Sequence, residues 1–410
     1  MFSGLTNIMA ALTLRVVATL ALVIISTSAV AFELGPVKVR GFLSQGFSLS
    51  SGNNFLGEST EGSFDSSMGA INFLWSPDPG VYFSAQLISR NYGESPINEE
   101  DLALDYGLIG VDLFTDRNNQ IDLRAGLLKI PMGIYGKTRD IPVTYPGVVL
   151  PQVLYAEWTR NSFLRSKGIG TEYKHNSLIG SINIEGQLGE VRMPRNQISG
   201  DNDPSVTNVP DPNFVALKAM YTTPNNMFFA GRSLLFVDYR SYSSSESGGL
   251  RIDSTNDNLI TTDISFAGLN INSWSLTAEY MRRKNDIKNT FAMYNSGTNT
   301  LVNSFELEHE NISKAYYVQL EKMFGSKHSG YIRNDNKYVV KSMGKTASNY
   351  TNSYVFGFNW RPTSKILIKA EHHYIDGGSA DMVLIDDNPN KADGYDRYWD
   401  LYLLQFIYSF

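Results

Sequence analysis

Apolar and polar residues alternate along most of this chain. Between 271 and 283, Trp274, Leu276 and Tyr280 occupy alternate positions, with serine, threonine and glutamate between them. The same alternation recurs at 81–87, 121–127, 260–266, 354–361 and 365–371. Successive side chains of a β-strand point to opposite faces, so this pattern predicts strands with one dry face and one wet face.

The alternating segments predict an all-β chain. They lie near 36–50, 64–76, 81–92, 101–115, 120–130, 166–175, 178–188, 212–222, 226–240, 258–267, 271–283, 312–324, 353–361, 365–376 and 397–410. An even strand number is expected of a closed bacterial barrel, so we predict one more strand within 325–352, around 329–342. The prediction is about 16 antiparallel strands, with fourteen or eighteen as the alternatives.

The connections between these strands alternate in length. Short, turn-like connections lie at 76–80, 116–120, 174–177, 222–226, 267–270 and 361–365. Long polar connections lie at 51–63, 131–165, 189–211, 241–257, 284–311 and 377–396. Transmembrane β-barrels of the bacterial outer membrane have short periplasmic turns and long external loops, whereas a soluble sandwich has no reason for this alternation.

Both ends of the chain support export to an outer membrane. Arg15 precedes an apolar run too short to span a bilayer, and Ala29-Val30-Ala31 is a small-x-small cleavage pattern. We therefore expect a signal peptide at 1–31 and a barrel at 32–410. Counting back from Phe410, alternate positions are Tyr408, Phe406, Leu404 and Tyr402, a pattern that resembles the terminal signal read by the barrel assembly machinery.

Composition is consistent with this architecture. Aromatic residues make up 12% of the 410 residues, and there is no cysteine. The formal charge of −6 becomes −7 if Arg15 is removed with the signal peptide, since it is the one charged residue there. Nothing in this composition favours nucleic-acid binding.

The connection 131–165 is the third long one, after 51–63 and 93–100. Its neighbourhood, Leu127-Leu128-Lys129-Ile130-Pro131-Met132-Gly133-Ile134-Tyr135 with Thr138-Arg139-Asp140, Leu150-Pro151-Gln152 and Tyr155, resembles the constriction-loop region of the porin superfamily, including phosphate-selective and dicarboxylate-type porins. The resemblance implies a third loop folded into the lumen, passive diffusion of small hydrophilic solutes, and a homotrimer. The dense basic rows of phosphate porins are not found here.

Candidate channel residues follow from this resemblance and from strand parity. For the constriction we expect Lys129, Lys137, Arg139, Asp140, Glu157, Arg160 and Arg165. For the lumen wall we expect Arg40, Arg90, Arg124, Lys174, Lys218, Arg232, Lys369, Asp122, Glu279 and Glu371, together with Glu172, Glu185, Asp263 and Glu321. Opposed charges across a narrow pore orient polar solutes, and rings of one sign select ions. For any single residue, a solvated charge is the plainer interpretation.

Other functions find less support. The five histidines show no nucleophile and acid at a recognisable spacing, so we expect no enzyme, no metal and no cofactor. The alternatives are a channel specific for an anionic solute, such as phosphate or a dicarboxylate, and an enzyme or adhesin barrel. Acidic clusters such as Glu306, Glu308 and Glu310 are typical of solvated loops, with divalent cations bridging to lipopolysaccharide as a second hypothesis.

Overall fold

The computed structural model describes residues 32–34, 36–92, 102–191, 206–208, 212–340, 350–377 and 396–410. The predicted signal peptide at 1–31 lies outside these residues. No helix among them is both long and apolar enough to cross a membrane.

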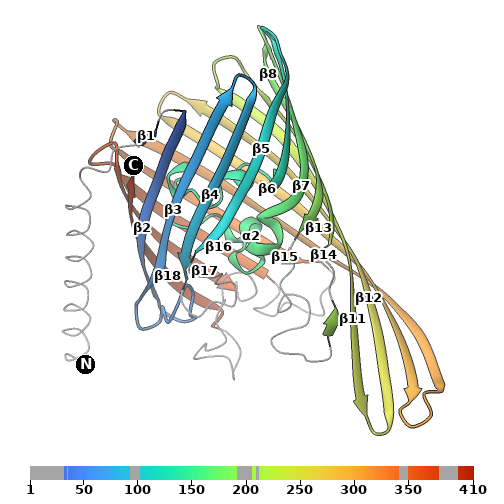
Figure 1. The fold of residues 1–410 in the computed structure, drawn as a ribbon. Helices are drawn as coiled ribbons and strands as arrows, with labels where there is room; N and C mark the ends of the chain where they lie inside the picture. Colours follow the sequence, from blue (N-terminus) through green and yellow to red (C-terminus); the bar gives the residue numbers. More distant parts are fainter. Residues whose placement is uncertain are drawn as a thin grey trace.

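Sixteen antiparallel strands of the described residues form a closed barrel (Figure 1). They are β2 (Val37–Ser50), β3 (Ser63–Asp78), β4 (Val81–Asn91), β5 (Ala103–Thr115), β6 (Asn119–Lys129), β7 (Arg165–Ser177), β8 (Gly180–Val191), β10 (Asn213–Thr222), β11 (Phe228–Ser247), β12 (Leu250–Ile271), β13 (Trp274–Asn295), β14 (Leu301–Phe324), β15 (His328–Val339), β16 (Tyr350–Trp360), β17 (Ile366–Gly377) and β18 (Tyr398–Ser409). Two short pieces, β1 (Phe32–Leu34) and β9 (Val206–Asn208), pair beside β2 and β11. The predicted strand number is confirmed, including the weakly patterned β15.

The last strand closes the barrel against the first long one. In β18, Ser409 is paired with Phe42 of β2 and Leu401 with Ser50. The terminal Phe410 continues this pairing, because its backbone exchanges hydrogen bonds of 2.9 and 3.0 Å with Gly41. Its ring lies against Gly41, where a Cβ would come within 2.4 Å of it. With this seam, every one of the sixteen described wall strands pairs on both sides, as a barrel in a bilayer requires.

The outer face of the wall carries an apolar belt. On β16, for example, Trp360, Phe358, Phe356 and Tyr354 point outward and are between 42% and 53% exposed. On β18 the inward residues Leu401, Leu403 and Ile407 are buried, and Tyr402 and Leu404 of the C-terminal pattern are 47% and 48% exposed on the outer face, whereas Tyr408 is buried. Aromatic residues at both ends of the belt are typical of a barrel in a bilayer.

Four strands are longer than predicted. We expected long loops at 241–257 and 284–311, but β11–β14 contain 20, 22, 22 and 24 residues and continue through both segments as paired strands. The β11–β12 turn is Gly248-Gly249, with φ of 60° and 79°, as a two-residue hairpin turn requires. In Figure 1 the four strands project past the rim at the lower right. Both faces there meet water, so the apolar alternation that marks a barrel strand disappears.

The barrel interior is packed by two segments that fold inward, 51–62 and 130–164. The second, called the inner segment below, holds the short helices η1 (Gly136–Thr138), η2 (Pro142–Thr144), α2 (Gln152–Tyr155), η3 (Glu157–Thr159) and α3 (Arg160–Phe163). Two apolar cores result. One joins Phe55 and Val148 to Trp399, and the other joins Leu154 to Leu235. The prediction that 131–165 folds into the lumen is confirmed.

Candidate pore constriction

The inner segment leaves the wall directly after β6. Gly133 adopts a φ of 53°, and a Cβ at this position would lie 2.2 Å from Tyr155 Oη and 2.3 Å from Glu279 Oε2. Only glycine fits such a close approach in the left-handed region of φ. The sequence Pro131-Met132-Gly133 therefore turns the chain into the lumen, where the segment crosses to the opposite wall.

Glu279 of β13 is the first anchor of the inner segment. Its carboxylate accepts hydrogen bonds from Tyr155 Oη at 2.9 Å, from Tyr317 Oη at 2.8 Å and from the backbone N–H of Ile134 at 3.1 Å. Next to it, Ser233 Oγ of β11 accepts the N–H of Gly133 at 3.0 Å. A buried carboxylate with three donors is well satisfied and fixes the chain entering the lumen.

Two residues of β17 form the second anchor, on the far wall. Lys369 Nζ donates to the carbonyl oxygens of Pro142, Tyr145 and Gly147, at 2.5 to 2.8 Å. Glu371 accepts the backbone N–H groups of Val148 at 2.8 Å and Val149 at 3.1 Å. Both side chains are almost fully buried. The middle of the inner segment is thereby tied to β17, which is separated from β6 by β18 and β2–β5.

A buried ionic cluster joins the inner segment to itself and to the wall near β4 and β6. Asp140 binds Arg160 at 2.9 Å and Lys129 at 2.6 Å. Glu157 pairs with Arg90 of β4. Arg139 donates to the carbonyl oxygens of Tyr155 and Ala156, at 2.7 and 2.6 Å.

This cluster shifts the titration of its carboxyl groups. Burial alone would raise the pKa of Asp140, but the charges of Arg160 and Lys129 outweigh burial and hold that pKa well below its usual range. In the same way, burial opposes ionisation of Glu157, and Arg90 and Arg139 reverse the effect, so its pKa is lowered. Both groups are therefore charged over the physiological pH range.

Burial changes the interpretation of several predicted constriction residues. Arg139, Asp140, Glu157 and Arg160 are between 2% and 6% exposed, so they stabilise the segment instead of facing a solute. Arg165 begins β7 and donates to the carbonyl oxygen of Leu104 at 2.7 Å.

An open cavity of about 270 Å³ lies between the inner segment and the wall formed by β3–β8. Its polar lining includes Tyr82, Tyr106, Arg124, Lys129, Lys137 and Glu185. Neither tyrosine was predicted. For Tyr82 a signal was present, because it shares alternate positions of its strand with the polar residues Ser84 and Gln86.

Each cation of this cavity has an acidic partner in or behind the lining. Arg124 binds Asp122 at 2.5 Å and also pairs with Glu172. Lys137 pairs with Glu185, and Lys129 lies between Asp105 and Asp140. Charges of both signs are thus held at fixed positions along one side of the lumen.

The remaining wall candidates are distributed around the barrel. Lys174 binds Glu172 at 3.1 Å, Lys218 lies 5.4 Å from the ring centre of Phe266, and exposed Arg40 has the inward parity of β2. Glu321 lines a second cavity, of about 240 Å³, beside Tyr145.

Arg232 and Asp263 lie on the outer face, so their assignment to the lumen is wrong. Ser233, the neighbour of Arg232, is buried and bonds the inner segment, whereas the Arg232 side chain is 60% exposed. The sequence does not reveal which face is inward here, because 234–237 is apolar at every position. Its inward residues pack on the inner segment, and its outward residues belong to the apolar belt.

Comparisons with known proteins support the fold. No protein-family model matches the sequence, and no curated protein matches it either. Solved structures do. OmpT, an outer membrane protein of Vibrio cholerae, has a TM-score of 0.52 at 10% identity, covering 93% of this chain and 99% of that one. The outer membrane channel DcaP of Acinetobacter baumannii has a TM-score of 0.51 at 11% identity, covering 91% and 97%. Salmonella typhi OmpF, in complex with daunomycin, has a TM-score of 0.51 at 11% identity, covering 92% of this chain and 98% of that one. The chain thus has a porin-like barrel fold.

Proposed function

We propose that this protein is a porin: a water-filled channel for passive diffusion of small hydrophilic solutes and ions across the outer membrane of a Gram-negative bacterium. The observation that carries the proposal is the inner segment. It is anchored on β13 and β17 and leaves a polar cavity beside β3–β8. A barrel with an apolar belt outside and a fixed polar passage inside is suited to diffusion.

The charges of the cavity favour a weakly selective pore. Arg124 and Lys137 each pair with an acidic residue on the wall, so the described part of the chain places no ring of one sign along the passage. A polar solute passing between these groups meets donors and acceptors on fixed supports. No step of this passage needs a cofactor or a reaction.

A channel specific for an anionic solute is the second candidate. Arg124, Lys129 and Lys137 line the cavity directly, whereas Glu185 is the acidic residue that reaches the same lining. An anionic solute that replaces the acidic partners of Arg124, Lys129 and Lys137 would bind these three cations directly. The passage would then prefer anions.

Single-channel conductance of the refolded mature protein in a planar bilayer tests the proposal, with reversal potential measured under a KCl gradient. We expect stable conductance steps and a reversal potential near zero. A reversal potential close to the chloride equilibrium value would favour the anion channel. A correctly folded barrel without conductance would refute the porin proposal and bring the enzyme and adhesin alternatives forward.

Several further properties belong to the same proposal. They are cleavage of 1–31, insertion by the barrel assembly machinery through the C-terminal pattern, contact with lipopolysaccharide and assembly as a homotrimer. The cation hypothesis for the projecting strands finds no support in the described residues, where no group of three potential ligands is placed to hold a metal ion. Lys288 instead binds Glu306 at 2.9 Å.

A further inference from the structure

The apolar belt ends in a regular way on β13 and β14. The outward residues Tyr280 and Tyr316 are direct register partners, 43% and 37% exposed. One outward position farther from the short turns, Arg282 of β13 is the direct partner of Lys314 of β14. Tyrosine at a belt edge lies at the level of lipid headgroups, so the basic pair stands at that level as well.

Two like charges directly opposite one another on paired strands destabilise a sheet. Neither Arg282 nor Lys314 has an acidic partner within 4 Å among the residues that the structure describes. Asp263 is the register partner of Arg282 on the other side, but both of its oxygens bind Arg232, with Nε at 2.8 Å from Oδ1. The repulsion within the basic pair is therefore not relieved by that carboxylate.

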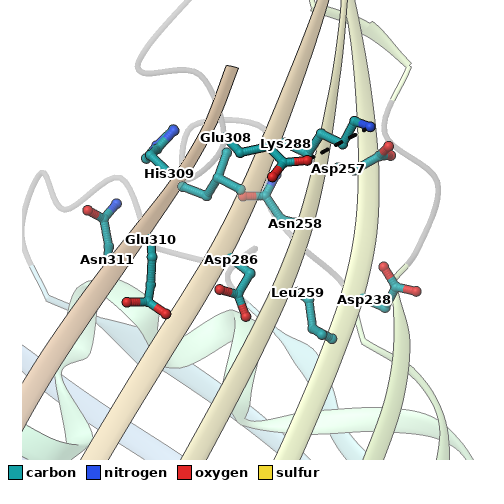
Figure 2. A pocket seen from close by; sticks show the side chains of 11 residues that line it. Asp238, Asp257, Asn258, Leu259, Asp286, Lys288, Glu308, His309, Glu310 and Asn311 are labelled. Atoms are coloured by element: carbon teal, nitrogen blue, oxygen red, sulfur yellow. Dashed lines mark ion pairs between the residues drawn. The ribbon is translucent and has the colours of Figure 1, made fainter. Parts of the chain in front are cut away.

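The surroundings restrict where an added anion would bind. Farther from the belt, the surface becomes acidic: Figure 2 shows Asp286 and Glu310 there, around a hollow of about 880 Å³. Lys284 lies 2.9 Å from both of these carboxylates, so it is already compensated. The uncompensated positive charge of Arg282 and Lys314 therefore lies in one row of the outer face, between Tyr280 and Tyr316 on one side and the acidic hollow on the other.

We propose that Arg282 and Lys314 bind a phosphoryl group on the headgroup of an anionic outer-leaflet glycolipid. A phosphate placed between the two side chains accepts charge-assisted hydrogen bonds from both, and its acyl chains lie along the exposed rings of Tyr280 and Tyr316. The inference rests on the proposed placement in an outer membrane but not on conduction, because both side chains are on the face away from the lumen.

The test uses the mature chain refolded in zwitterionic micelles, with diphosphoryl lipid A as the probe and bound lipid counted by native mass spectrometry. At about 1 kcal/mol per basic residue near a membrane surface, the double variant R282Q/K314Q should bind about thirtyfold more weakly. K322Q is the matched control, since Lys322 faces outward on β14 at the opposite end of the belt, where Trp274 is its register partner. It should bind as the unchanged protein does.

Three results would overturn the proposal. One is equal binding by R282Q/K314Q, and another is equal weakening by K322Q, which would indicate diffuse attraction. The third is displacement of the lipid by inorganic phosphate at equal concentration, which would indicate a free-anion site. In the first case, a changed oligomeric state of the double variant would show that the pair contacts a second copy and not a lipid. Conductance is recorded for each variant, so failure of the porin proposal is seen separately.

Discussion

Lys369 and Glu371 stand two residues apart on the inner face of β17 and bind one short stretch of chain through opposite groups. Lys369 donates hydrogen bonds to the carbonyl oxygens of Pro142, Tyr145 and Gly147. Glu371 accepts hydrogen bonds from the N–H groups of Val148 and Val149. The stretch is held by its backbone, so the anchor does not depend on the side chains at 142–149. Both wall residues are needed to fix its direction.

Glu371→Gln should loosen the inner segment. The amide has one acceptor oxygen in place of two, so it cannot serve both the backbone N–H groups that bind Oε2 and the Tyr331 hydroxyl that donates to Oε1. Leaving one such buried group unsatisfied costs about 1–3 kcal/mol. We expect more open-channel noise and a larger mean conductance in bilayer recordings. Asp376→Asn is the matched control, because Asp376 is on the same strand with outward parity and pairs with Arg397. Equal noise in both variants would contradict the anchor.

Tyr155 and Glu279 should be energetically coupled. Tyr155→Phe removes the hydroxyl that donates to Glu279, and Glu279→Gln replaces one of the two carboxyl oxygens that accept it. Each change should lower the free energy of unfolding by about 1–3 kcal/mol, with a coupling of at least 0.5 kcal/mol in a double-mutant cycle. The measurement is urea unfolding in detergent, followed by tryptophan fluorescence. Strictly additive effects would mean that the two side chains act independently.

Acid should release the inner segment before it unfolds the wall. The pKa values of Asp140 and Glu157 are lowered in the folded protein, so their contribution is complete above the unfolded values, about 4, and is lost as pH falls through the folded values. Limited proteolysis within 130–164 should therefore begin below about pH 4, where acid-active pepsin is used. In D140N/E157Q the segment should be cleaved readily at pH 7, and its cleavage should depend less on pH. Identical profiles for the two proteins would refute this assignment.

Ion selectivity should follow the open cavity and not the buried cluster. Glu185→Gln removes the acidic partner of Lys137 and should shift the reversal potential toward anions, and Arg124→Gln should shift it toward cations. Arg139→Gln should leave the reversal potential unchanged in channels that remain folded, while lowering thermal stability, because Arg139 donates to two buried carbonyl oxygens. A selectivity change in Arg139→Gln alone would place the passage elsewhere.

The wall could be predicted from the sequence because its chemistry differs between faces. Alternation at Tyr354–Trp360 or Trp274–Tyr280 records an exposed apolar outer face on one side and a wet or packed interior on the other. Where both sides are alike, the signal is lost. The strands are polar on both faces at 241–257 and apolar on both at 234–237, so length and parity were misjudged there.

The inner segment shows a different limit. Its place in the lumen followed from counting connections, yet the roles of Arg139 and Arg160 did not, since a charged residue in a loop looks the same in sequence whether it meets a solute or a buried carboxylate. Asp140 lies 20 residues before Arg160, and Arg90 lies 67 residues before Glu157. Pairs at such separations are set by the folded wall.

The seam between β2 and β18 also determines when the barrel can form. Its partners, from Phe42 with Ser409 to Ser50 with Leu401, come from opposite ends of the barrel sequence. No cylinder can close until the final dozen residues have been synthesised and delivered. Every earlier intermediate has two unsatisfied strand edges and an exposed apolar outer face, and contacts of such wide sequence separation form slowly. A chain truncated before Tyr398 would keep fifteen strands of the wall and still be unable to close it.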